Sequence, residues 1–239
     1  MLFICSYFLL FFIYCVIGYI VEVSFIAICQ KKLNFSRGFL IGPYIPIYGA
    51  GIMLMTTLLT KYQDDYIVLF ILGATLCTIL EYITSYIMEK IYKLRWWDYS
   101  NKKFNINGRV CLENSVLFGL GELVVIKLIN PLFERFINCM SPTLVIILAM
   151  VTFLIFITDV IISIFITFNL GININEYIKV DATSKIKKEI EKRFKSYTFL
   201  HKRILKAYPN IASLDRKKLK FIREMISQSK KELKKIKDK

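Results

Sequence analysis

The chain has 239 residues, of which 56% are hydrophobic, and its mean hydropathy is +0.51. This apolar fraction lies above the roughly 45–50% that is typical of soluble domains. The net charge of +15 is unevenly placed, because residues 179–239 contain 21 Lys and Arg against 7 Asp and Glu, a net charge of +14. The composition excludes an ordinary soluble protein and predicts an integral membrane protein with a basic segment at residues 179–239.

Five apolar runs follow one another along the first 172 residues, over 3–28, 39–60, 66–91, 112–129 and 143–170. Runs of about 20 residues suffice to cross a bilayer as helices. We therefore predict an all-α, polytopic transmembrane domain over residues 1–172, built as two parallel helical hairpins plus one helix. No Lys or Arg precedes Lys31, so the first run is expected to be retained rather than removed as a signal peptide. Pro43 is expected in the first turn of the second helix, and Pro46 is expected to kink it.

The connections between the runs differ in charge. Those at 30–38 and 89–111 hold three and six Lys or Arg residues, whereas the alternate side holds only Lys61, Lys127 and Arg135, together with three acids. By the positive-inside rule, the N-terminus is expected outside the cell and the C-terminus in the cytoplasm. The pattern predicts a multi-pass protein of the plasma membrane.

The basic segment 179–239 is predicted to be a helical cytoplasmic tail. Apolar residues recur in it at three- or four-residue steps on both sides of a break at Pro209. One explanation of the positive charge is that the tail fixes the topology of the protein in the membrane. The alternative is that the tail docks on an anionic lipid surface or on a partner protein. Nucleic acid is not an expected partner, because nothing in the tail resembles a nucleic-acid-binding motif.

Several kinds of chemistry find no support in the sequence. Its six cysteines form no C-x-x-C pair and it has a single histidine, so we expect no metal site, no cofactor and no nucleophile-histidine catalysis. A phosphate-binding loop followed by Lys and Ser or Thr is also missing. The chain is therefore not expected to be an enzyme, and ATP-driven transport would require a separate ATP-binding subunit.

Acidic residues within the apolar runs are the main pointers to function: Glu22, Glu81, Glu122 and Asp159. Counted from the ends of the runs, all four are predicted at a similar depth, roughly 10–17 Å from the cytoplasmic face. An isolated charge at such a depth costs on the order of 2.5–3.5 kcal/mol, so these side chains should face the protein interior. They would line a substrate cavity together with Glu113, which is expected at the inner interface beside Arg95 or Arg109. The alternative is that each acid makes a hydrogen bond between helices.

A weak internal repeat relates Gly38–Gly51 to Gly108–Gly121, with glycines matching at the first, twelfth and fourteenth positions. Each copy follows a basic connection and a helix that carries a glutamate. The repeat predicts that the two connections lie side by side on the cytoplasmic face, above Glu22 and Glu81.

The polar connections carry the residue patterns R-G-F-x-x-G-P, W-D-Y-S and N-I-N-G-R. Over about residues 8–170 these motifs resemble the bacterial "putative ABC-transporter type IV" family of CmpB-like permeases. The resemblance implies a membrane transport component, and it carries over neither a substrate nor a catalytic residue. From the residues themselves we expect an interfacial aromatic belt with a tight turn, or a gate or partner-docking surface, at Arg37, Gly38, Gly42, Pro43, Pro46, Arg95, Trp97, Asp98, Tyr99, Asn105, Asn107, Gly108 and Arg109.

Together these features favour a permease-like protein that moves a small polar or cationic solute, driven by a separate ATPase or by a proton gradient. One alternative is a membrane enzyme that acts on lipid or isoprenoid head groups. Another is a non-transporting sensor or scaffold that signals through its tail. The residues do not exclude a homo-oligomer.

Overall fold

The computed structural model describes residues 1–31, 35–92, 95–179, 203 and 207. Its helices are α1 (Leu2–Gln30), α2 (Pro46–Leu59), the 3₁₀ turn η1 (Thr60–Tyr62), α3 (Tyr66–Tyr92), α4 (Leu112–Val124), the π-helical turn η2 (Val125–Ile129), α5 (Asn130–Asn138) and α6 (Pro142–Lys179). Two short antiparallel strands, β1 (Asn105–Ile106) and β2 (Val110–Cys111), form a hairpin before α4. The predicted all-α class is confirmed, with this hairpin as an addition.

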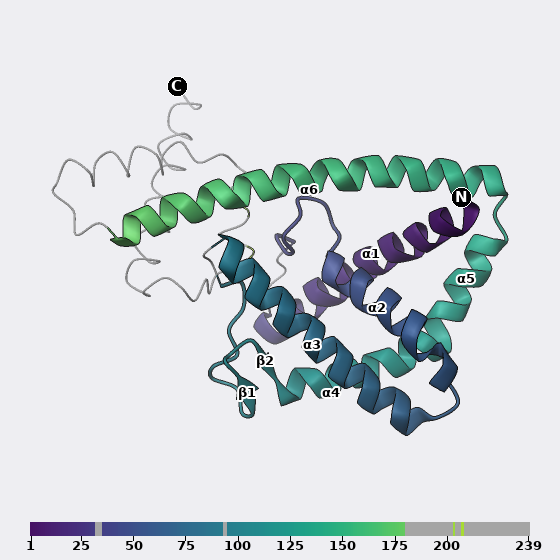
Figure 1. Cartoon of the computed structure of the whole chain (residues 1–239), viewed down its shortest axis with the longest axis horizontal. Coiled ribbons are helices and arrows are strands. Elements are labelled where there is room, and N and C mark those ends of the chain that lie inside the picture. The colour runs from purple at the N-terminus through teal and green to yellow at the C-terminus, as the bar shows by residue number, and fades with distance from the viewer. Residues whose placement is uncertain (32–34, 93–94, 180–202, 204–206, 208–239) are drawn as a thin grey trace.

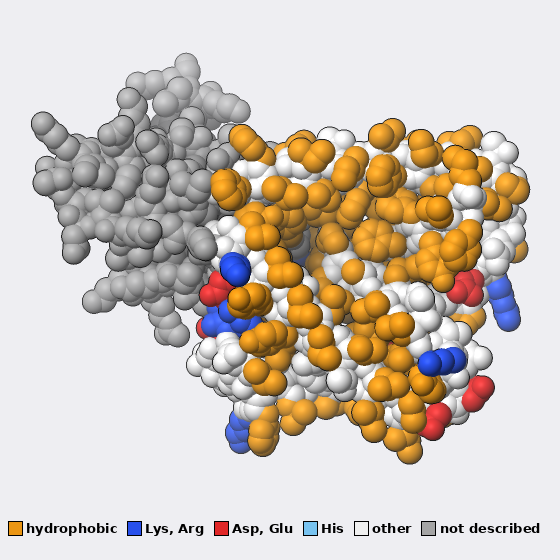
Figure 2. Space-filling view, viewed as in Figure 1, with side chains coloured by type: hydrophobic (Ala, Val, Ile, Leu, Met, Phe, Trp, Pro, Cys, Tyr) orange, Lys and Arg blue, Asp and Glu red, His pale blue; other side chains and the backbone are white. Residues whose placement is uncertain are grey.

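Among the described residues, four helical stretches are long and apolar enough to cross a membrane: Leu2–Ile28, Tyr66–Tyr92, Leu112–Asn138 and Pro142–Phe168. In Figure 1 the β1–β2 hairpin lies at the left end of the bundle, and the α2–α3 and α5–α6 connections lie at the right end. Figure 2 shows hydrophobic side chains over the face between these ends, with charged side chains gathered near both edges. This distribution is that of a protein whose middle contacts lipid.

The second predicted span, 39–60, differs from the observed helix. Only Pro46–Leu59 is helical, which gives α2 a length of about 21 Å at 1.5 Å per residue. Residues 38–45 instead form an irregular segment, and the Ile45 amide donates a hydrogen bond to the Cys15 carbonyl near the middle of α1 (2.9 Å). The predicted kink at Pro46 is wrong, because Pro46 begins the helix, where its missing N–H removes no hydrogen bond.

The fourth predicted span, 112–129, is longer than expected and contains an irregular turn. The π-helical turn η2 precedes Pro131, which has no N–H to donate to the Lys127 carbonyl four residues earlier. The backbone widens there and continues as α5 to Asn138. The fifth predicted span, 143–170, also continues, to Lys179. The predicted tail, 179–239, lies outside the described residues apart from Lys179, Arg203 and Ala207.

Helices approach each other closely at glycines of the internal repeat. A Cβ atom on Gly49 would lie 2.6 Å from the Phe11 carbonyl of α1, and one on Gly119 would lie 2.9 Å from the Phe70 carbonyl of α3. Gly38 and Gly108, the first glycines of the two copies, both have positive φ, +80° and +64°. The repeat is therefore structural at two positions: the first glycine of each copy has a positive φ, and the twelfth lets α2 approach α1 and α4 approach α3 closely.

Candidate functional site

In the part of the chain that the structure describes, three carboxyl groups are at least nine-tenths buried: Glu81 at 7% exposure, Glu122 at 4% and Asp159 at 9%. The other two predicted site acids lie closer to the surface. Glu22 is half-buried, and Glu113 is exposed and pairs with Lys102 across 2.7 Å, instead of the expected Arg95 or Arg109. The five predicted acids therefore occupy different environments.

Glu81 of α3 lies beneath the polar connection that precedes α4. The Tyr99 hydroxyl donates a hydrogen bond to Glu81 Oε1 (3.1 Å). The other carboxylate oxygen, Oε2, is buried and has no hydrogen-bond partner among the described residues. Because a buried polar atom without a partner is costly, Glu81 Oε2 marks a place where a proton or a ligand would be stabilised.

Glu22 of α1 belongs to the same region. Its Oε2 accepts a hydrogen bond from the Tyr48 hydroxyl of α2 (3.0 Å). Burial raises the pKa of Tyr99, and the negative charges of Glu81 and Glu22 both raise it further. The Glu81 carboxyl thus contacts the Tyr99 hydroxyl, and the Glu22 carboxyl lies within electrostatic reach of it. We call Glu22, Tyr48, Glu81 and Tyr99 the inner carboxyl cluster.

Glu122 of α4 lies deeper in the bundle than this cluster. A Cβ atom on Gly73 would lie 3.0 Å from Glu122 Cγ, and Gly73 precedes Glu81 by eight residues, about 12 Å along α3. The expected common depth of Glu81 and Glu122 is therefore not found. The reason is the connection 95–111, which packs along the last turns of α3, so that α4 begins well inside the bundle.

Asp159 of α6 is fully engaged by the segment before α2. It accepts hydrogen bonds from the amides of Ile41 (2.9 Å) and Gly42 (2.7 Å), from the Tyr44 hydroxyl (2.6 Å) and from the Ser163 hydroxyl (2.9 Å). These four donors satisfy an ionised carboxylate at membrane depth. Asp159 therefore anchors the R-G-F-x-x-G-P motif, including Gly42 and the adjoining Pro43, to α6.

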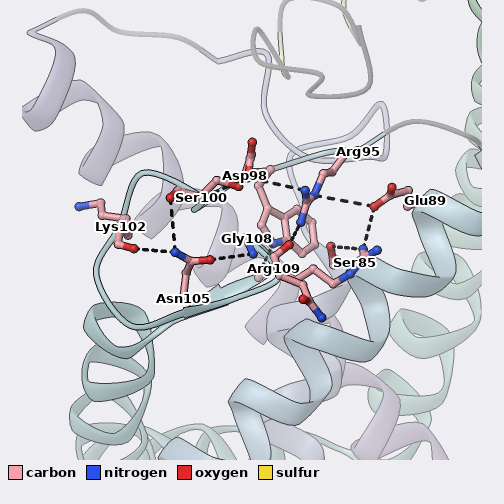
Figure 3. Close-up of polar contacts among 11 residues, drawn as sticks. Ser85, Glu89, Arg95, Asp98, Ser100, Lys102, Asn105, Gly108 and Arg109 are labelled. Atoms are coloured by element: carbon pink, nitrogen blue, oxygen red, sulfur yellow. Dashed lines mark hydrogen bonds and ion pairs between the residues drawn. The ribbon is translucent and has the colours of Figure 1, made fainter.

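The connection 95–111 is braced by a polar network at the end of α3 (Figure 3). Glu89 pairs with Arg109 (2.8 Å) and with Arg95 (3.8 Å), and Arg109 also donates to the Ser85 hydroxyl (3.3 Å). Arg95 reaches Asp98 (3.7 Å) and the Asn107 carbonyl. Both arginines are thus bound to α3 and to the loop itself.

The turn within this connection depends on Asn105 and Gly108. The Asn105 side chain donates to the Lys102 carbonyl and accepts from the Gly108 amide (2.8 and 2.9 Å), and Asn107 has a positive φ of 53°. Partial burial works to raise the pKa of Asp98, but hydrogen bonds from Ser100 and the Arg95 charge outweigh it and hold this pKa below its usual value. The predicted tight turn is confirmed by these contacts.

The two motif-bearing connections meet through aromatic rings. Phe39 lies 5.8 Å from Trp96 and 5.7 Å from Tyr92, measured between ring centroids. Trp97 donates its indole N–H to the Arg109 carbonyl (2.9 Å). The segment that follows Arg37 and Gly38 thus lies against the connection 95–111, and the cytoplasmic placement of both stays a prediction. The buried member of the tryptophan pair is Trp96, at 3% exposure.

Arg37, at the start of the first motif, contacts a residue far along the chain. Its Nη1 donates to the Ala207 carbonyl (3.0 Å), and Arg203 Nη2 donates to the Arg37 carbonyl (2.9 Å). All three residues are buried. Arg37 is therefore hydrogen-bonded to the region of the chain that the sequence predicts to be the tail.

Sequence reasoning missed the hydroxyl partners of Asp159 and Glu22, namely Tyr44 and Ser163 for Asp159 and Tyr48 for Glu22. Tyrosines are common in membrane proteins, and nothing in their spacing marks Tyr44 and Tyr48. In the described part of the chain, no group of three or more His, Cys, Asp or Glu side chains has a metal-binding arrangement.

The fold and this site define a polytopic α-helical membrane protein with acids buried inside its bundle. The chain belongs to the family described as "Putative ABC-transporter type IV", whose model matches residues 9–164. The match covers both motif-bearing connections and the four acids of the predicted spans, and it confirms the resemblance seen in the motifs. Comparisons with curated proteins and with solved structures give no match.

Proposed function

We propose that this chain is the membrane component of a transporter, and that its inner carboxyl cluster binds a small cationic or polar solute. The observation that carries the proposal is the buried Glu81 Oε2, which has no hydrogen-bond partner among the described residues, with the Glu22 carboxyl within electrostatic reach of Glu81. Two acids beside one another favour a cation or a shared proton. Membership of a transporter-related family supports the same reading.

Tyr99 is the gate in this proposal. It lies in the connection 95–111 and caps Glu81 from the end that the charge pattern assigns to the cytoplasm. A solute that enters from that end has to displace the Tyr99 hydroxyl from Glu81. The brace formed by Glu89, Arg95 and Arg109 sets where Tyr99 lies, so a partner that moves this brace would open the gate.

A separate ATP-binding subunit is the partner that the family name suggests. Its docking surface would be the exposed part of the connection 95–111, around Lys102 and Lys103. Copurification of the chain from its native membrane with an ATPase tests this part of the proposal. Recovery of the chain without any ATP-binding protein, under conditions that keep other transporters intact, argues for the proton gradient as the energy source.

Solute binding is tested on the full chain in detergent by thermal unfolding in a panel of small organic and inorganic cations. We expect one class of cation to raise the unfolding temperature of the wild type and not that of Glu81→Gln. Glu113→Gln is the matched control, because Glu113 is exposed and paired with Lys102. An equal response of wild type and Glu81→Gln would refute the assignment.

The same preparation separates the two rival functions. Turnover of lipid or isoprenoid head groups by the purified chain would favour the membrane enzyme. A cellular phenotype that is reproduced by deleting residues 180–239 alone, with cation binding intact, would favour the sensor or scaffold.

A further inference from the structure

The most isolated ionisable side chain in the described bundle is Glu122. It is 4% exposed, and its Oε1 has no hydrogen-bond partner among the residues described. Lys127, the basic residue nearest to it along the chain, pairs instead with Asp64 (3.5 Å) and lies over the Tyr66 ring. Glu122 therefore has no ion-pair partner in the described part of the structure.

The groups around Glu122 are neutral or acidic. On α3, Gly73 backs its Cγ atom, and Cys77 lies one turn further along the same face. Cys77 is within electrostatic reach of both Glu122 and Glu81, and Tyr14 of α1 is within reach of both Glu122 and Glu134. An ionised carboxylate in such a place would cost several kcal/mol, and protonation removes that cost.

A chain of polar side chains leads from Tyr14, which lies within electrostatic reach of Glu122, to the surface at the α5–α6 end. The buried Tyr14 hydroxyl donates to Asn130 Oδ1 (2.8 Å), and Asn130 Nδ2 donates to Glu134 Oε1 (2.8 Å). Glu134 is exposed. The π-helical turn η2 lies between Glu122 and Asn130, and π-bulges in helices occur frequently at functional sites.

Hydrogen bonding between helices explains only part of this arrangement. The Tyr14–Asn130 bond joins α1 to α5 and needs no further function. Within the described residues Glu122 makes no such bond through Oε1, so it adds nothing to helix association that a glutamine or an apolar residue could not supply. A residue that costs stability and joins no helices is expected to have another role.

We propose that Glu122 is a proton-binding site, separate from the inner carboxyl cluster, which exchanges its proton with the outer side along Tyr14, Asn130 and Glu134. In the resting state the proton is on the Glu122 carboxyl. Release leaves the Glu122 carboxylate and ends with that H⁺ on the exposed Glu134 carboxylate, and reloading reverses the step without any change of oxidation state. Tyr14 and Asn130 are positioning residues for this exchange.

The inference deepens the proposed transport function, because a proton site inside the membrane component would allow coupling to a proton gradient. Proton binding itself does not depend on the solute. A failure of the solute assignment at Glu81 therefore leaves this proposal standing, and the reverse is also true.

Carbodiimide labelling of the full chain in proteoliposomes tests the protonation state, since the reagent modifies protonated carboxyls in apolar surroundings. Mass spectrometry should find Glu122 modified at neutral pH and the modification lost as the pH is raised. Glu81→Gln should keep this labelling, and Glu113→Gln is a second control. An unmodified Glu122 in protein that elutes as a single folded species would overturn the proposal.

Exchange with the outer side is measured in the same vesicles by following the carbodiimide labelling of Glu122 at set times after the external pH alone is raised. We expect the wild type to lose this labelling quickly after the pH step. Tyr14→Phe should keep the labelling at neutral pH but lose it at least tenfold more slowly, whereas Tyr62→Phe in η1 should behave as the wild type. A wild-type response of Tyr14→Phe, or wild-type labelling that does not follow the external pH, would contradict the exchange route.

Discussion

The Tyr99 hydroxyl lies 3.1 Å from Glu81 Oε1 and joins a surface connection to a carboxyl inside the bundle. The loop therefore covers the buried acid directly. Its position follows from the brace on α3, in which Glu89 binds Arg109 and Arg95.

Tyr99→Phe removes this hydrogen bond and leaves the ring in place. A hydrogen bond to a charged group contributes about 1.5–3 kcal/mol, so we expect cation binding at Glu81 to change by roughly tenfold or more. The direction distinguishes two roles: tighter binding indicates a gate that competes with the solute, and weaker binding indicates a ligand of the solute. Thermal unfolding with the cation series measures the change, and no change would remove Tyr99 from the site.

Asp159→Asn should destabilise the protein strongly. The amide nitrogen would face the N–H groups of Ile41 or Gly42, which now donate to a carboxylate. We expect a loss of about 3 kcal/mol or more, because buried donors are left without an acceptor. Thermal unfolding in detergent gives the measurement, and Asp64→Asn is the control, since Asp64 is exposed at the other end of the bundle. Equal stability of the two variants would contradict the anchoring role.

Gly108→Ala should disrupt the connection 95–111. Gly108 has a φ of +64°, and a Cβ atom there would lie 2.5 Å from an Asp98 carboxylate oxygen. Left-handed backbone costs a non-glycine residue about 1–2 kcal/mol even before such a clash. Limited proteolysis of the loop reports the effect. Gly121→Ala is the matched control, because nothing lies within 4 Å of a Cβ atom there, and helix propensity favours alanine by about 1 kcal/mol.

The orientation of the chain remains a prediction from its charges, and thiol labelling tests it. Cys139 is exposed at the α5–α6 end, and it should react with a membrane-impermeant maleimide from outside the cell. Cys111 is buried and is a poor probe for the other side, so Lys103→Cys in the exposed part of the connection should be used there. Labelling of Lys103→Cys from outside would reverse the topology.

The sequence by itself determined the class of the protein, the approximate places of its long helices and the acids within them. Long apolar runs are expected to form transmembrane helices, because a bilayer forces the backbone N–H and C=O groups to hydrogen-bond within each helix. It also indicated the turn at Asn105–Gly108 and the meeting of the two motif-bearing connections. Glycine and asparagine report backbone conformation locally, so the turn needed no knowledge of the tertiary structure, whereas the meeting of the two connections was predicted from the internal repeat.

Only the tertiary structure decided which acids lie together. Residue counting placed Glu81 and Glu122 at one depth, but the connection 95–111 occupies the end of α3 and shifts α4 inward. It likewise showed that Asp159 is engaged by residues 41–44, and that Tyr14 bonds Asn130, 116 positions away. Helices that are apolar on every side carry little periodic signal for the face that meets a neighbour, because lipid and protein interior are similarly apolar. Packing of small residues such as Gly49, Gly73 and Gly119 sets those faces, and it is visible only once the helices are assembled.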